Sequence, residues 1–137
     1  MKALVRNNLL KDCSAMAHHK AGHFDWSKLS RINLPYHPSD SDYQVNGDSP
    51  LLIIPISQMS KGGNVTPETA RIYGLMWLKM CFKEYYIRKV PLFHICLHSP
   101  CMLDKYYIGI IDKLLEYINE HENINFKFVS EVNEYAK

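Results

Sequence analysis

The sequence lacks the features that would place it in a specialised class of protein. Its charge is nearly balanced, with 16 Lys and Arg residues against 14 Asp and Glu residues and a formal net charge of +2. This balance gives no electrostatic reason to expect a nucleic-acid or anionic-membrane partner. No apolar run approaches the roughly 20 residues that a membrane-spanning helix needs, and the N-terminal segment lacks the apolar stretch of a signal peptide. We therefore expect a cytoplasmic protein without nucleic-acid or membrane partners.

Glycine, proline and paired cysteines are also scarce. Six glycines and seven prolines among 137 residues are too few for a fibrous or low-complexity chain. The length and a hydrophobic content of 47% are typical of one globular domain, which we expect to span residues 1–137. The four cysteines form no Cys-x-x-Cys pair, and without an export signal we expect reduced thiols rather than disulfides.

The chain is organised as three unlike segments. Residues 1–14 predict a short helix or strand at the start. Residues 15–49 show no sustained hydrophobic period and predict a long irregular loop. Such a loop is uncommon inside a compact domain and is usually functional, or a sign that the surrounding fold is incomplete. Residues 50–137 have regular patterns and predict a parallel α/β core.

The regular part alternates between strand and helix patterns. The expected elements are a buried strand at 51–56 that ends near Pro55, a helix at 67–88, a strand at 91–98, a helix at 102–121 and a strand at 125–129. This order predicts right-handed parallel βαβαβ units. The helix at 67–88 is apolar nearly all round, so we expect it to be covered on more than one side. Its expected start has Thr66 as N-cap, Pro67 in the first turn and Glu68 as an acid near the positive helix end. The helix at 102–121 is expected to carry an apolar stripe of Tyr107, Ile110, Ile111, Leu114, Leu115 and Ile118. Three or four strands are few for that much apolar helix surface, which suggests half of a barrel or of an open sheet.

Imidazole and thiol groups gather in the strand predicted at 91–98. His94, Cys96 and His98 lie on one face of that strand, and Cys101 follows it. These are zinc's preferred ligands. However, same-face neighbours on one strand lie about 6.6 Å apart, which is wide for a shared ion. The cluster is interpreted either as a weak metal site through His94 and Cys96, or as a polar interior with one working histidine.

His98 is the candidate catalytic residue. It lies at the carboxyl end of a predicted parallel strand, where catalytic groups of α/β sheets and barrels collect. A histidine there can act as a general acid or base. The alternative is a hydrogen-bonded core histidine.

The irregular segment carries further candidates. Trp26 and Tyr36, with Asp25, could line a carbohydrate or acyl pocket, or the two aromatic side chains could pack in the core. The polar residues of this segment could supply metal ligands or be solvated; they are His18, His19, His23, His37, Asp25, Asp40 and Asp42.

The order of these features resembles a known family. The segments that carry the resemblance are Asp12-Cys13-Ser14, Phe24-Asp25-Trp26, Pro35-Tyr36, residues 52–57, residues 93–100 and residues 126–129. Over residues 8–136 the chain resembles the C-terminal portion of polysaccharide deacetylases of the NodB-homology type, and it spans about half of that family's domain. The resemblance implies the C-terminal half of a distorted (β/α)7 barrel.

The resemblance also implies a chemistry, which is metal-dependent hydrolysis of acetyl groups on sugars. Cys96-Leu97-His98 corresponds loosely to the family's Leu-x-His motif, with His98 as general acid. The implied cofactor is a divalent, zinc-like metal, and the implied substrate is an acetylated sugar or polysaccharide. The family's Asp-Asp and His-x-x-x-His motifs, which supply the base and the metal ligands, are missing. We therefore expect Met1 to fall inside the family's domain, with no cofactor and no deacetylase activity in the isolated chain.

Two further interpretations and one partner prediction remain open. The exposed sheet edge and apolar helix faces of a half-barrel favour a homo-oligomer. The chain could instead be a small metal-binding α/β hydrolase that uses its own His and Cys cluster. It could also be a non-catalytic carbohydrate or protein interaction module with Trp26, Tyr36 and Tyr43 on its binding surface.

Overall fold

The computed structural model describes residues 1–59, 63–100 and 103–133, and the chain forms two compact units. The loop unit comprises Met1–Ser57 and Lys127–Lys137, and the helical unit comprises Gln58–Phe126. Within the described ranges, every helix is too short or too polar to span a bilayer. The single domain that chain length suggests stays a prediction.

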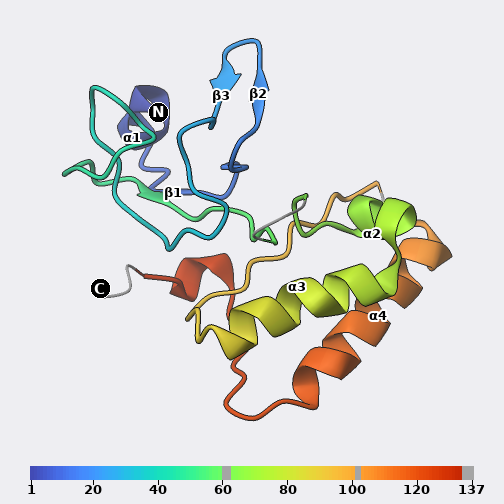
Figure 1. Cartoon of the computed structure of the whole chain (residues 1–137). Coiled ribbons are helices and arrows are strands. Elements are labelled where there is room, and N and C mark those ends of the chain that lie inside the picture. The colour runs from blue at the N-terminus through green and yellow to red at the C-terminus, as the bar shows by residue number, and fades with distance from the viewer. Residues whose placement is uncertain (60–62, 101–102, 134–137) are drawn as a thin grey trace. The chain divides into compact units, whose positions relative to one another are not determined.

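Short elements build the loop unit (Figure 1). They are α1 (Lys2–Arg6), β1 (Lys11–Asp12), β2 (Lys20–Ala21), β3 (Phe24–Asp25), β4 (Leu52–Ile53) and a 3₁₀ helix (Val129–Glu131). β1 pairs in parallel with β4, and β2 pairs with β3 as an antiparallel hairpin. Gly22 has a φ of +57° in the turn of this hairpin, where glycine carries no Cβ penalty.

The apolar run that begins at Leu51 is the centre of the loop unit. Every residue from 51 to 57 is buried, as expected for a strand covered on both faces. β4 has β1 on one side and an antiparallel bridge to Tyr36 on the other. The strand ends before Pro55, as predicted, because proline cannot donate to a ladder. The core around it is closed by Ala15, Ala17, Trp26, Leu29, Tyr36, Leu51 and Ile53.

Among the described residues of the second unit, the α-helices are α2 (Pro67–Tyr73), α3 (Leu75–Ile87) and α4 (Lys105–Asn119). α2 starts as predicted, with Thr66 as N-cap in a capping box with Thr69 and Pro67 in the first turn. The single helix predicted over 67–88 is interrupted at Gly74, whose φ of +82° suits glycine. Asp104 caps α4, whose predicted apolar stripe is confirmed by the buried Tyr107, Ile110, Ile111, Leu114 and Ile118.

The helical core lies where these helices meet. Its buried members are Val65, Ala70, Leu78, Cys81, Phe82, Ile110, Leu114 and Ile118. Rings gather around Phe82, with Phe93, Tyr117 and His121 edge-on to it at centroid distances of 5.0–6.0 Å. That the helix predicted at 67–88 is covered on more than one side stays a prediction. In the described residues α3 buries Leu78, Cys81, Phe82 and Tyr85, whereas Ile72 and Met76 are 73% and 68% exposed.

The strands predicted at 91–98 and 125–129 are not formed. A strand needs a neighbour to accept its backbone hydrogen bonds, and β4 finds that neighbour in β1 rather than in 91–98. Among the described residues, β1 and β4 are the strands that pair in parallel. The fold is therefore mixed α/β, and no βαβαβ arrangement is present among those residues. Figure 1 shows α3 and α4 running in the same direction, and residues 88–100 lead back from the end of α3 toward the start of α4.

Among the described residues, Cys81 and Cys96 are free thiols.

Candidate functional site

His98 lies beside Glu68 and Cys96 in the helical unit. Glu68 is in the first turn of α2, directly after the N-cap Thr66 and Pro67. The segment that carries Cys96 and His98 is held against this turn by a backbone hydrogen bond, in which Cys96 N–H donates to Val65 O at 3.1 Å. Because Val65 is fully buried in the core, this bond places both side chains beside a fixed helix start.

The three side chains form a line with the imidazole in the middle. His98 Nδ1 lies 2.6 Å from Glu68 Oε1, a distance typical of a charge-assisted hydrogen bond. His98 Nε2 lies 3.8 Å from Cys96 Sγ. The carboxylate can only accept when ionised, so the proton in the first contact belongs to Nδ1. This leaves Nε2 as the acceptor that faces the thiol when the ring is neutral.

The site is at the surface, and its members differ in exposure. The His98 side chain is 59% exposed and that of Glu68 is 34% exposed, so solvent and a ligand can reach the ring. Cys96 is partly buried, and burial, followed by the negative charge of Glu68, raises the pKa of its thiol. The thiol is therefore protonated near neutral pH, and a base is needed to generate a thiolate there.

The structure brings part of the predicted cluster together. Contact between Cys96 and His98 agrees with the same-face spacing predicted from the sequence. His94 is partly buried in the same segment, and Cys101 lies outside the described residues. Among the described residues, no group of three or more His, Cys, Asp or Glu side chains is arranged to hold a metal ion. Binding of the divalent metal that the family resemblance implies stays a prediction.

The substrate-binding candidates are packing and turn residues of the loop unit. Trp26 is 3% exposed, and its ring meets that of Tyr43 edge-on at 4.9 Å. Tyr36 is also buried, and its hydroxyl donates to Tyr43 O at 2.9 Å. Asp25 accepts from the backbone and hydroxyl of Ser27 and pairs with Lys20 at 2.8 Å. These contacts are those of the core alternative, and sugar binding by the three residues stays a prediction.

The histidines of the irregular segment are dispersed. His37 Nδ1 donates to the backbone carbonyls of Ser49 and Leu51, so it closes a loop rather than facing a ligand. The His19 ring packs edge-on against Phe24 at 5.4 Å. Asp42 pairs with Lys28. His18, His23 and Asp40 belong to no metal-holding group in the described part of the chain.

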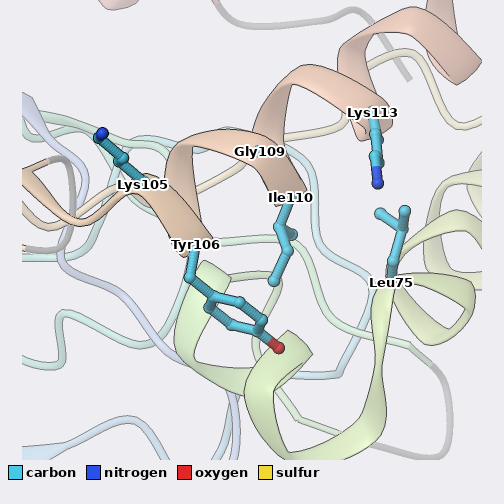
Figure 2. A pocket seen from close by; sticks show the side chains of 6 residues that line it. All are labelled: Leu75, Lys105, Tyr106, Gly109, Ile110 and Lys113. Carbon is cyan, nitrogen blue, oxygen red and sulfur yellow. The ribbon is translucent and has the colours of Figure 1, made fainter.

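Two features of the helical unit were missed by sequence reasoning. The sequence indicates Glu68 only as an acid in the first turn of a helix. Its contact with His98 joins residues that are 30 positions apart, and no local sequence pattern predicts such a contact. The second feature is a pocket of about 390 Å³ lined by Leu75 of α3 and by Lys105, Tyr106, Gly109, Ile110 and Lys113 of α4. Figure 2 shows the Lys113 ammonium directed toward Leu75, whereas Lys105 points away.

The fold and the site together define a small mixed α/β protein with a carboxylate–imidazole–thiol cluster at its surface. Comparison with protein families, with curated proteins and with solved structures finds no match for this chain.

Proposed function

We propose that this chain is a polysaccharide deacetylase-like protein in which His98 is the general acid–base group. The observation that carries the proposal is the 2.6 Å contact between His98 Nδ1 and Glu68 Oε1. A carboxylate at one ring nitrogen fixes the tautomer and the orientation of the imidazole, which leaves the other nitrogen to exchange a proton. Because the ring is more than half exposed, that nitrogen can reach the leaving oxygen or nitrogen of an acetylated sugar.

The fold that we propose for the complete assembly is a distorted barrel of which this chain supplies the C-terminal half. Parallel α3 and α4 with a returning segment between them are the helix arrangement that a parallel α/β unit requires (Figure 1). Residues 91–98 and 125–129 would then pair as strands only beside strands that this chain does not supply. This account also explains why patterns typical of strands remain unpaired here.

We propose that a second copy of the chain covers the exposed apolar side chains of α2 and α3. Large apolar side chains lie exposed on α2 and α3, namely Ile72, Tyr73, Met76 and Met80. Exposed clusters of this kind commonly mark interaction surfaces. We expect light scattering on a sizing column to give a homo-oligomer, and the single change Met76→Lys to shift it toward monomer. A monomer at all concentrations would contradict the homo-oligomer.

The isolated chain is not expected to release acetate by a metal-dependent route. The sequence lacks the family's Asp-Asp and His-x-x-x-His motifs, and the described residues offer no replacement ligand set. Without a base and a metal to activate water, one acid–base histidine is insufficient for that route.

The test of the proposed function is a nuclear magnetic resonance titration with a short N-acetylglucosamine oligomer. We expect the His98 ring resonances to move with saturation, while those of His37, which closes a loop in the other unit, stay in place. The variant His98→Gln should bind more weakly, and His94→Ala serves as a matched control in the same segment. If the oligomer leaves His98 unchanged at millimolar concentration, the deacetylase-like assignment is wrong.

A further inference from the structure

The order of the three side chains in the candidate site matches that of an activated nucleophile. A thiol, Cys96 Sγ, faces one imidazole nitrogen at 3.8 Å, and a carboxylate, Glu68, holds the other at 2.6 Å. Nucleophile, base and orienting group are the three parts that covalent acyl transfer requires. The first contact is longer than a productive hydrogen bond, as is common before a substrate is bound.

Backbone contacts hold the segments that carry Glu68, Cys96 and His98 next to each other. The backbone bond from Cys96 to Val65 and the capped start of α2 fix the two segments relative to each other. The 3.8 Å contact between Cys96 Sγ and His98 Nε2 places the two side chains on the same side of the segment, although it is not paired as a strand. Because the backbone bond and the capped helix start hold the backbone, rotation of the Cys96 and His98 side chains is enough to bring Sγ closer to Nε2.

We propose that Cys96 is a nucleophile that accepts an acetyl group from O-acetyl esters, with His98 as its base and Glu68 as the positioning residue. The choice of an acetyl ester of a sugar as substrate rests on the proposed function. The nucleophilic role of Cys96 rests on the geometry of the cluster alone. An ester, rather than an amide, suits a thiol because its alkoxide leaving group departs more readily than an amine anion.

The reaction proceeds in two balanced steps. In the first, His98 Nε2 takes the thiol proton while Sγ bonds to the carbonyl carbon; the ester C–O bond then breaks, and the alcohol leaves with the proton from Nε2. In the second, Nε2 takes a proton from water, whose oxygen bonds to the thioester carbon. The C–S bond breaks, acetate is released and the proton returns to Sγ. The sum is ester plus water giving acid plus alcohol.

The first experiment measures acetylation of each cysteine by p-nitrophenyl acetate, using peptide mass spectrometry of the full chain. Cys13, which is also partly buried, is the internal control. Because general-base catalysis contributes about 100-fold or more, His98→Gln should slow acetylation of Cys96 by about 100-fold and leave Cys13 unchanged. The adduct on Cys96 should be removed by hydroxylamine. Equal acetylation of the two thiols, or no response to His98→Gln, would overturn the proposal.

The role of Glu68 has its own readout, the nitrogen chemical shifts of the His98 ring. Glu68→Gln should shift the ring away from the Nδ1–H tautomer and slow acetylation of Cys96 by about 10-fold, whereas Glu68→Asp should restore part of both. An unchanged tautomer in Glu68→Gln would refute positioning by Glu68, even if the variant is less stable.

An O-acetylated sugar separates this inference from the proposed function. Transfer of its acetyl group to Cys96 supports both. Acetylation by p-nitrophenyl acetate without transfer from the sugar upholds the nucleophile and rejects the sugar ester as its substrate. Binding of the N-acetylglucosamine oligomer at His98 without any Cys96 adduct upholds the proposed function and rejects the nucleophile.

Discussion

The loop unit and the helical unit are held together in different ways. In the loop unit, polar side chains bind the backbone at many turns; Asp12 and Asp25, for example, each accept from the backbone and the hydroxyl of a serine two residues on. In the helical unit, apolar stripes and rings meet between helices. A loop-built region must satisfy its backbone groups through side chains, because it has few ladders and helical turns to do so.

The candidate functional residues differ between the units as well. The cluster of Glu68, His98 and Cys96 in the helical unit is partly exposed and lies beside the start of α2, where Cys96 N–H donates to Val65 O. The aromatic residues of the loop unit, which the sequence offered as ligand contacts, are used to close a core. Residue type alone did not separate the aromatic side chains that pack in the core of the loop unit from the polar side chains that stay partly exposed beside α2.

The largest expected effect comes from the apolar stripe of α4. Leu114 is fully buried, so Leu114→Ala should lower the free energy of unfolding by about 2–5 kcal/mol through lost contacts and a cavity. The matched control is Leu103→Ala at an 88% exposed position, which should stay within about 0.5 kcal/mol of the wild type. Urea denaturation measures both. Similar losses for the two variants would show that the stripe does not hold this unit.

The same substitution at two glycines should have opposite signs in the two units. A Cβ at Gly47 would lie 2.5 Å from Ser39 Cα, which is backbone, so Gly47→Ala should destabilise by about 1–3 kcal/mol. A Cβ at Gly109 of α4 meets nothing within 4 Å, and Gly109→Ala should stabilise by up to about 1 kcal/mol through helix propensity. Thermal unfolding measures each sign. Stabilisation by Gly47→Ala would mean that the loop unit is not tightly closed at this turn.

A lysine tethers the C-terminal segment to β1 in the loop unit. Lys11 Nζ donates to the carbonyls of Val129, Ser130 and Val132, at 3.2, 2.6 and 2.6 Å. Lys11→Met keeps the apolar stem but leaves those carbonyls without the ammonium, so we expect local opening to become easier by about 1–2 kcal/mol. Hydrogen exchange at the Val132 amide reports this opening, and Lys2→Met on exposed α1 is the control. Unchanged exchange at Val132 would show that the tether contributes nothing.

What the sequence predicts well is local or periodic. The cap at Thr66, the stripe of α4 and the buried run from Leu51 follow from spacing alone. Contact between Cys96 and His98 follows from alternation over two residues. Each of these depends on neighbours within a few positions, where the chain has little freedom.

What the sequence does not predict is which segments find partners. Alternation at 91–98 describes a segment with two faces, but a strand also needs a neighbouring strand, and that depends on the whole chain. Glu68 and His98 are 30 residues apart, and they meet where the backbone of Cys96 binds that of Val65. The break at Gly74 also escaped prediction, because apolar residues continue across it and a lone glycine is tolerated in helices.

The smallest expected effect is the acid sensitivity that an exposed ion pair gives the loop unit. Lys20, and then Ser27, hold the pKa of Asp25 well below its usual range. A carboxyl whose folded pKa is depressed contributes stability above its unfolded pKa of about 3.9, and this stability is lost as the pH falls below that value. Because the Lys20 side chain is 66% exposed and solvent screens the pair, the loss is small and should shrink further in salt. Urea midpoints at about pH 6 and about pH 3 should therefore differ less in Asp25→Asn than in the wild type, while Asp48→Asn, at an exposed site of the same unit, should match the wild type. If the two urea midpoints differ as much in Asp25→Asn as in the wild type, the Lys20–Asp25 pair contributes no stability. The loop unit would then depend on its buried apolar residues, as the helical unit does.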